Sequence, residues 1–350
     1  MKKLGIGIVG AGGIAQRNGR EALSSGVANI SGVFDVNHKA AGELANALGV
    51  QAFGSYESLL EDQSTEAVLL SLPHHLHRSS AIQAAESGKH VLVEKPMANT
   101  LEDAEAMIRA CQENGVKLSV NYSFRYLPKI RLARQFVEEG GLGEICGVQA
   151  VMHQHKDKGY WAGGRSNSPD DWRASKEKCG GGFLIMNLCH VIDYLSYITG
   201  LNVERTYAEY ATLASPIEVE DIISVNCRFD NGAVGTFCGS SIMRGIDIDE
   251  QCVWGTNGTI VLNGTGLQVY STRPVINKRP GKTHNIKKFK NLSWTAEWVR
   301  EFCLAVSEDR EPEVGLREGW DNLALIQAAY ESLEEGGPKM PRKFPFSESS

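Results

Sequence analysis

The chain has 350 residues, of which 42% are hydrophobic and 22% are charged, and its formal net charge is −6. These values are ordinary for a globular protein, and the length predicts two domains. The acidic balance and the lack of a basic stripe argue against nucleic acid as a partner. No apolar run is as long as a membrane-spanning helix, so we expect no membrane partner and a cytoplasmic protein. The eight cysteines form no C-x-x-C pair, which argues against a zinc site of the usual spacing.

The first part of the chain alternates apolar, strand-like runs with helix-like stretches. The predicted strands are residues 4–9, 30–34, 67–72, 90–93 and 116–120, and the predicted helices between them include 39–48, 79–87 and 101–114. Continuous apolar strands separated by amphipathic helices indicate a parallel sheet that is covered on both faces. We therefore expect residues 1–122 to form an α/β domain of the Rossmann type.

Strands dominate the second part of the chain. After a predicted helix at 129–139, the predicted strands are 145–153, 205–212, 221–229, 234–240 and 251–255, with helices at 183–198, 295–307 and 318–335. Asn231-Gly232 is a strong hairpin signal, and Asn257-Gly258 and Asn263-Gly264 repeat it, because Asn-Gly readily adopts positive φ. Residues 123–350 are thus predicted to form an α+β domain around an antiparallel meander, with a C-terminal tail that packs back.

A glycine-rich segment lies between the first predicted strand and the helix that follows it. Gly10-Ala11-Gly12-Gly13-Ile14-Ala15 fits the pattern G-x-G-x-x-G/A, with alanine in the last place. Gly10 permits a tight turn, Gly12 lets the backbone approach a pyrophosphate, and the helix N-terminus presents free N–H groups to the anion. In this strand–turn–helix context the pattern predicts a dinucleotide site. A glycine-rich turn with a purely structural role is the alternative.

Asp35 ends the second predicted strand, 20 residues after Ala15. A carboxylate at this place accepts hydrogen bonds from the adenosine ribose hydroxyls and repels a 2′-phosphate. The sequence therefore favours NAD over NADP. A solvated aspartate at the end of a strand is the alternative reading.

Glu94-Lys95-Pro96 follows the apolar strand 90–93. The carboxyl ends of the strands in an open parallel sheet line the ligand crevice, so we expect Lys95 to lie near the nicotinamide end of the cofactor. A lysine there is suited to exchange a proton with a substrate hydroxyl while a hydride leaves the same carbon. Taken alone, a lysine at such a position is more often an ordinary surface residue.

These segments together resemble the Gfo/Idh/MocA family of oxidoreductases. The resemblance covers Gly10 to Ala15, Gly88-Lys89-His90-Val91, Glu94-Lys95-Pro96, the segment 121–126, Gly180-Gly181-Gly182 with His190 and Asp193, and the segment 329–332. It implies NAD(P)-dependent alcohol–ketone chemistry on sugars, polyols or glycosides. It also implies a second domain with a large, open, mainly antiparallel sheet that often serves oligomer contacts, so we expect a homodimer or homotetramer.

By this resemblance Lys95 is the catalytic lysine and His190 reaches the reacting hydroxyl. Asn187 and Asp193 lie three residues on either side of His190 and share its helix face. Asn187 could bind a substrate hydroxyl, and Asp193 could orient the imidazole. Many relatives carry an aspartate four residues before the histidine, where this chain has Met186, so the proton relay is expected to rest on Lys95 and His190 alone. A satisfied core histidine is the alternative for His190.

Two further segments are predicted to line the site. Pro73-His74-His75-Leu76-His77 follows the third strand and resembles a family loop that lines the cofactor; we expect no metal there, since no convergent carboxylate accompanies the histidines. Aromatic faces stack on sugars and arginine binds hydroxyls or carboxylates. The candidate substrate contacts are Arg125, Tyr126, Tyr160, Trp161, Trp172, Arg173, Asn187 and His190, and the candidate cofactor contacts are Gly10, Gly12, Gly13, Ile14, Asp35, Pro73, His77, Glu94 and Lys95.

The sequence leaves two other functions open. Some relatives oxidise a sugar transiently, eliminate a leaving group and reduce the sugar again, which makes them NAD-retaining glycosidase-like enzymes. Others are non-enzymatic sensors of NAD or sugar. The presence of both Lys95 and His190 argues against a sensor, because a sensor does not need a proton relay.

Overall fold

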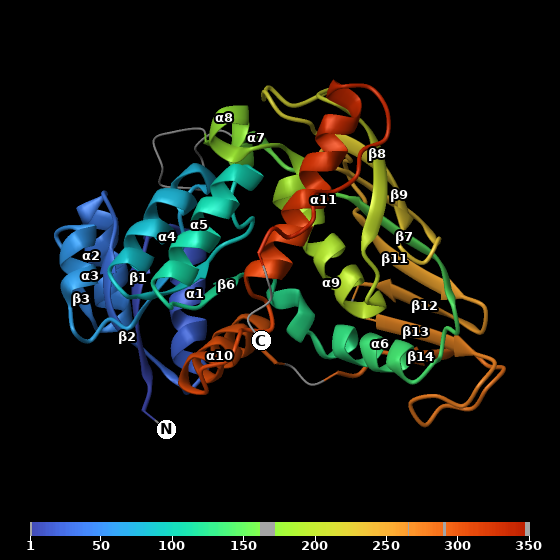
Figure 1. Cartoon of the computed structure of the whole chain (residues 1–350), viewed down its shortest axis with the longest axis horizontal. Helices are drawn as coiled ribbons and strands as arrows, with labels where there is room; N and C mark the ends of the chain where they lie inside the picture. The colour runs from blue at the N-terminus through green and yellow to red at the C-terminus, as the bar shows by residue number, and fades with distance from the viewer. Residues whose placement is uncertain (1, 162–171, 265, 290–291, 347–350) are drawn as a thin grey trace. The chain divides into compact units, whose positions relative to one another are not determined.

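A computed structural model describes residues 2–161, 172–264, 266–289 and 292–346. The chain divides into two compact units: unit 1 comprises Met1–Ser123, Asp157–Gly180 and Ser293–Leu323, and unit 2 comprises Phe124–Lys156, Gly181–Leu292 and Ala324–Ser350. The path of the chain through the two units can be followed by colour in Figure 1. Two segments that belong to unit 1, residues 157–180 and 293–323, thus come after residue 122, where we expected the first domain to end.

Unit 1 is built on a six-stranded sheet with the order β3-β2-β1-β4-β5-β6, in which all neighbouring strands run parallel. The strands are β1 (Leu4–Val9), β2 (Ala28–Phe34), β3 (Gln51–Ala52), β4 (Ala67–Leu70), β5 (His90–Val93) and β6 (Leu118–Val120). This is the strand order of dinucleotide-binding Rossmann sheets, and it changes direction between β1 and β4. The predicted parallel sheet is confirmed.

Helices connect the strands of this sheet. They are α1 (Gly13–Ser24), α2 (His38–Leu48), α3 (Tyr56–Glu61), α4 (His77–Glu86) and α5 (Leu101–Glu113), with a short helix η1 (His74–Leu76) before α4. All four residues of β4 are fully buried. Because successive side chains of a strand point to opposite faces, both faces of the sheet are covered at β4. Continuous apolar strands were therefore the correct signal for a parallel sheet.

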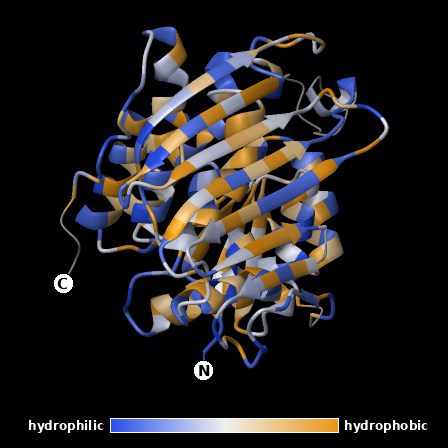
Figure 2. Ribbon diagram, turned by 90° about the vertical axis from the view of Figure 1, so that its right-hand side faces the viewer, coloured by the Kyte–Doolittle hydropathy of each residue, from blue (hydrophilic) through white to orange (hydrophobic). Residues whose placement is uncertain are grey.

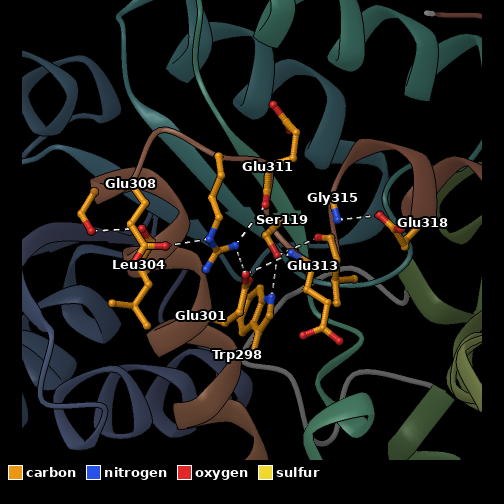
Figure 3. Close-up of polar contacts among 12 residues, drawn as sticks. Ser119, Trp298, Glu301, Leu304, Glu308, Glu311, Glu313, Gly315 and Glu318 are labelled. Atoms are coloured by element: carbon orange, nitrogen blue, oxygen red, sulfur yellow. Dashed lines mark hydrogen bonds and ion pairs between the residues drawn. The ribbon is translucent and has the colours of Figure 1, made fainter. Parts of the chain in front are cut away.

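The returning segment 293–323 covers the open edge of this sheet at β6. The indole N–H of Trp298, on α10 (Trp294–Ser307), donates to Ser119 Oγ at 2.8 Å, and Ser119 Oγ donates to the carbonyl of Val314 at 2.8 Å (Figure 3). The backbone N–H of Val120 donates to the same carbonyl at 3.2 Å. An exposed edge strand presents unpaired backbone groups, so these contacts explain why a segment from the far end of the chain belongs to unit 1.

Unit 2 contains an eight-stranded sheet with the order β14-β13-β12-β11-β7-β10-β9-β8. The strands are β7 (Ile145–His153), β8 (Val203–Ala211), β9 (Ile222–Phe229), β10 (Val234–Ser240), β11 (Ile248–Gly255), β12 (Gly258–Asn263), β13 (Gly266–Ser271) and β14 (His284–Ile286). The three Asn-Gly pairs lie at the turns that connect β9 to β10, β11 to β12 and β12 to β13, and in each case the two strands pair antiparallel. The sheet is mainly antiparallel, as expected, and the antiparallel meander is broken in one place, because β7 and β10 pair in parallel. The long connection between them, which contains helices and the hairpin β8–β9, permits that direction.

Hydrophobic and hydrophilic residues alternate along the strands of this sheet (Figure 2). In β12 the alternate residues Gly258, Ile260 and Leu262 are buried, and one face of the sheet packs against α6 (Pro128–Glu138) and α9 (Cys189–Thr199). Beyond α11 (Leu316–Glu334), Lys339 and Thr206 exchange two backbone hydrogen bonds of 2.8 Å at the edge strand β8.

The predicted helix 183–198 is not a continuous α-helix. It begins as a π-helical turn, η4 (Leu184–Leu188), and continues as α9.

Within the described residues, one helical stretch, Lys176–Thr199, is long and apolar enough to cross a membrane, with a mean hydropathy of 1.2 over its most apolar 18 residues. However, 83% of those residues are buried inside the protein. Burial of this extent is typical of a core helix.

Candidate active site

The glycine-rich loop lies at the carboxyl end of β1. Gly10 has φ +96°, and a Cβ atom there would lie 2.4 Å from the carbonyl oxygen of Ser71. Its N–H donates to the carbonyl of Phe34 at 2.8 Å. Both the backbone angle and the close approach to the strand end at Ser71 require glycine, which explains the first glycine of the pattern.

The loop leaves the N-terminus of α1 open. Among the described residues no side chain caps this helix, which begins after Gly12. A Cβ atom at Gly12 or Gly13 would meet no described atom within 4 Å, and Ile14 is 47% exposed. The first N–H groups of a helix lack intrahelical partners and carry partial positive charge, so this open end fits a pyrophosphate.

Asp35 is held beside this loop at the end of β2. Its Oδ2 accepts a hydrogen bond of 2.6 Å from the N–H of Ala11, and its Oδ1 accepts one of 2.7 Å from the N–H of Asn37. The side chain is half-buried. Each carboxylate oxygen has a second lone pair, so the fixed carboxylate can still accept hydrogen bonds from ribose hydroxyls.

Glu94, at the carboxyl end of β5, accepts hydrogen bonds from two buried asparagines, Asn18 on α1 and Asn121 after β6. Glu94 Oε1 accepts from Asn18 Nδ2 at 2.6 Å and from Asn121 Nδ2 at 2.7 Å. Asn121 Oδ1 is buried and has no hydrogen-bond partner among the described residues. A buried acceptor without a partner is costly, so its presence at this edge fits a site that a ligand donor completes. Asn18 was not predicted from the sequence, although a polar residue on the apolar face of α1 was a usable signal.

The loop after β4 contains two buried, neutral histidines near Lys95. His77 is fully buried, its Nδ1 lies 2.9 Å from the carbonyl oxygen of Pro96, and its Nε2 lies 3.1 Å from that of Leu72. Burial lowers the pKa of His77 to about 4, and it lowers the pKa of His74 well below its usual range. The positive charge of Lys95 contributes to both shifts, which indicates that its ammonium lies near both imidazoles. Lys95 itself is half-buried.

The candidate aromatic residues of unit 1 form a stack around an arginine. The guanidinium of Arg173 lies 4.4 Å from the ring centre of Trp172 and 5.3 Å from that of Tyr160. The ring of Trp172 meets the ring of His74 at 4.6 Å and 60°. Trp161 packs edge-on against Tyr160 at 4.9 Å, and its buried indole N–H has no hydrogen-bond partner in the described part of the chain. The stack thus joins η3 (Trp172–Ala174) and α7 (Lys158–Trp161) to the histidine loop.

In unit 2 the imidazole of His190 is held by an aromatic neighbour. The ring of Phe124 stacks on it, with ring centres 4.7 Å apart and an angle of 26° between the planes. Asn187, one helical turn earlier, has a buried Oδ1 without a hydrogen-bond partner in the regions described. Met186, at the position where many relatives carry an acid, is 2% exposed. Phe124 was part of the segment that carried the resemblance, but no local pattern predicted its contact.

Arg125 and Asp193 form a bidentate ion pair in the same unit. Arg125 Nε donates to Asp193 Oδ2 at 2.9 Å and its NH2 group donates to Oδ1 at 2.7 Å, and the two side chains are 9% and 0% exposed. Tyr126 is 7% exposed, and the guanidinium of Arg131 lies 4.8 Å from its ring centre. The side chain of Arg125, a candidate substrate contact, is therefore engaged with a carboxylate that we expected to orient His190.

Comparisons with known proteins agree with this arrangement. A family model described as oxidoreductase family, NAD-binding Rossmann fold, matches residues 4–122, and the model of the Gfo/Idh/MocA C-terminal domain matches residues 130–261. This chain belongs to the Gfo/Idh/MocA oxidoreductase family. Its N-terminal sheet is accordingly an NAD-binding Rossmann fold, as the glycine pattern predicted.

Individual relatives of this Gfo/Idh/MocA protein are sugar oxidoreductases by name. Levoglucosan dehydrogenase of Pseudarthrobacter phenanthrenivorans is 31% identical over 256 residues, which are 66% of this chain and 64% of that protein. The 1,5-anhydro-D-fructose reductase of Ensifer adhaerens is 27% identical over 92% of this chain and 95% of its own length. A solved structure of levoglucosan dehydrogenase in complex with NADH has a TM-score of 0.87 at 24% identity and covers 98% of this chain and 100% of the solved chain, a likeness that establishes the fold.

Proposed function

We propose that this protein transfers a hydride between NAD and a secondary hydroxyl or ketone of a sugar, polyol or glycoside. The observation that carries the proposal is the order of the strands in unit 1. The carboxyl ends of β2, β1, β4 and β5 are neighbours along one edge and present, in that order, Asp35, the glycine loop, the histidine loop and Lys95. Neighbouring strands are about 4.8 Å apart, so Lys95 follows a strand about 10 Å from the strand that ends in the glycine loop.

An extended dinucleotide along this edge would have its adenosine ribose at Asp35 and its pyrophosphate at the N-terminus of α1. Gly10, Gly12, Gly13 and Ile14 would line the pyrophosphate, and Pro73, His77, Glu94 and Lys95 would surround the other end. Bound NAD supplies the group that accepts or donates the hydride. Asp35 supports NAD over NADP, because its fixed carboxylate would repel a 2′-phosphate.

Lys95 is proposed to take the proton from the substrate hydroxyl in the direction of oxidation and to return it in the direction of reduction. His74 and His77 are buried and their pKa values are lowered, so we assign the exchange of that proton to Lys95 and not to either imidazole. His190 is proposed to bind the same hydroxyl, with its ring plane held by Phe124. The buried Oδ1 of Asn187 supports a further contact with a substrate hydroxyl.

The substrate class is proposed from the names of the relatives and from the aromatic stack. Levoglucosan and 1,5-anhydro-D-fructose are polyhydroxylated rings, and the exposed C–H faces of such rings pack on aromatic side chains. Tyr160, Trp161, Trp172 and Arg173 are the proposed substrate contacts in unit 1, and Arg125 and Tyr126 are proposed substrate contacts in unit 2.

We also propose a homodimer or homotetramer that works in the cytoplasm. Large apolar side chains on the sheet of unit 2 are exposed, namely Val234 at 52%, Trp254 at 39%, Ile248 at 37% and Tyr270 at 36%. Burying them between two copies would remove apolar surface from water. All eight cysteines are free thiols, which supports a reducing compartment. Light scattering on the purified protein tests the assembly, and a monomer would contradict it.

The test of the function is a substrate panel that follows nicotinamide absorbance. Levoglucosan, D-xylose, glucose 6-phosphate and myo-inositol are offered with NAD or NADP, and 1,5-anhydro-D-fructose is offered with NADH. We expect net turnover with at least one of them and a loss of at least about 1000-fold in kcat for Lys95→Ala. Lys89→Ala is the control, because the Lys89 ammonium donates to the carbonyl of Thr65 at 2.7 Å, away from the Lys95 loop. Unchanged turnover in Lys95→Ala would remove this residue from the mechanism.

A further inference from the structure

A buried carboxylate holds the start of the helical segment that carries Asn187 and His190. Glu220 is 4% exposed, and its Oε2 accepts a hydrogen bond of 2.6 Å from the N–H of Gly182. Its Oε1 accepts one of 2.9 Å from the N–H of Leu184 and one of 2.8 Å from the hydroxyl of Tyr330. All three groups donate, so the ionised carboxylate is the form that satisfies them. Burial raises the pKa of Glu220, and these hydrogen bonds oppose the shift.

The glycines before this helix make the arrangement possible. A Cβ atom at Gly182 would lie 1.9 Å from the carbonyl oxygen of Glu220, and one at Gly181 would lie 2.3 Å from the hydroxyl of Tyr330. The same Glu220 carbonyl accepts a hydrogen bond of 3.1 Å from the N–H of Phe183. Two glycines of the Gly180-Gly181-Gly182 run are therefore required for close contact with Glu220 and Tyr330.

The segment that Glu220 anchors has an unusual backbone. In η4 the N–H of Cys189 donates to the carbonyl of Leu184, five residues earlier, which is the bond of a π-helix. Such turns occur mostly as single insertions and often at functional sites. One inserted residue rotates the rest of a helix by about 100°, because an α-helix has 3.6 residues per turn. The anchored first turn and the π-turn together therefore determine the direction in which His190 projects from α9.

We infer that Glu220, supported by Tyr330, is a positioning residue for His190. It joins the N–H groups of Gly182 and Leu184 to the segment just before β9 and, through the hydroxyl of Tyr330, to α11. The π-turn thereby keeps one register, and the imidazole of His190 keeps one position. The inference rests on the proposed role of His190 in the reaction. Neither Glu220 nor Tyr330 is proposed to touch the substrate or the cofactor.

A double-mutant cycle separates positioning from general stability. Glu220→Gln keeps the shape of the side chain but turns an amide NH2 toward N–H donors. With the substrate identified by the panel and NAD, we expect it to lower kcat by about 10–100-fold, since small misplacements cost that much. In a His190→Asn background the same change should lower kcat less than about threefold. Tyr330→Phe should also lower kcat in the wild-type background but not in the His190→Asn background, with a smaller decrease than Glu220→Gln. It serves as the test if Glu220→Gln does not fold.

Asp221 is a matched control next to Glu220. It is fully buried, and its carboxylate accepts three backbone hydrogen bonds of 2.8 Å from Leu213, Ala214 and Ser215, which lie outside the helix of His190. Asp221→Asn should lower the melting temperature as Glu220→Gln does. Asp221→Asn should change kcat by less than about threefold, and equally in the wild-type and His190→Asn backgrounds.

The position of the imidazole can also be read without turnover. In the spectrum of protein with ¹⁵N-labelled histidine, His190→Asn identifies the His190 signals, and Glu220→Gln or Tyr330→Phe should shift them whereas Asp221→Asn should not. Unmoved signals, or equal kcat losses in the two backgrounds, would overturn the inference. If His190→Asn leaves kcat unchanged, the proposed function of His190 fails, while the signals still report whether Glu220 positions its ring.

Discussion

The ion pair between Arg125 and Asp193 is predicted to be one of the most sensitive points of unit 2. Both side chains are almost fully buried, at 9% and 0% exposure, and two hydrogen bonds of 2.7 and 2.9 Å join them. Asp193→Ala would leave the guanidinium buried without its carboxylate, although the ring of Tyr197 lies 5.2 Å from it. Removing one partner of a buried pair costs about 3–5 kcal/mol. For a unit of roughly 150–250 residues this corresponds to a decrease of about 6–20 °C in Tm.

The double variant Arg125→Met/Asp193→Leu separates the cost of an unpaired charge from the value of the pair. An apolar pair of similar volume is often neutral or stabilising, so we expect the double variant to be more stable than Asp193→Ala. Thermal unfolding followed by circular dichroism measures the change, and hydrogen exchange of peptides from α9 and from β1 assigns it to unit 2. The reasoning would be refuted if Asp193→Ala lowered Tm by less than about 2 °C, or if the double variant were the least stable.

Three other predictions concern unit 1. Gly10→Ala should lose measurable NAD binding in calorimetry, because the residue has φ +96° and no space for a Cβ atom. Gly42→Ala is the control, since no described atom lies within 4 Å of its Cβ; it should bind NAD normally, and its free energy of unfolding should rise by up to about 1 kcal/mol. Asp35→Ser should lower the ratio of NADP to NAD dissociation constants by at least about tenfold, and an unchanged ratio would contradict the assignment of the ribose site. His77 has a pKa of about 4 in the folded protein and about 6.5 in the unfolded chain. Its contribution of about 3 kcal/mol to the free energy of unfolding is therefore complete above pH 6.5 and is lost as the pH falls to 4. His77→Asn should therefore flatten the decrease of Tm between pH 6.5 and 4, and an identical slope would show that His77 is not the group responsible.

The local sequence was sufficient for the elements and for the glycine loop. The predicted bounds of β1, β5, β7 and β10 agree with the structure, because apolar periodicity reports burial within a few neighbouring residues. Positive φ at Gly10 and Gly232 follows from the same kind of short-range signal. Residues at the ends of parallel strands could also be assigned to one edge of the sheet, since that geometry is common to all such sheets.

The tertiary structure alone decided which polar groups pair. Arg125 and Asp193 are 68 residues apart, Glu94 and Asn18 are 76 apart, and Glu220 and Tyr330 are 110 apart. A charged or polar side chain in a sequence has many possible partners, and only packing determines which one is near enough to satisfy it after water is removed. The same holds for two other features, the parallel pairing of β7 with β10 and the return of residues 293–323 to the edge of β6. Each depends on contacts between segments far apart in the chain, about which a local pattern carries no information.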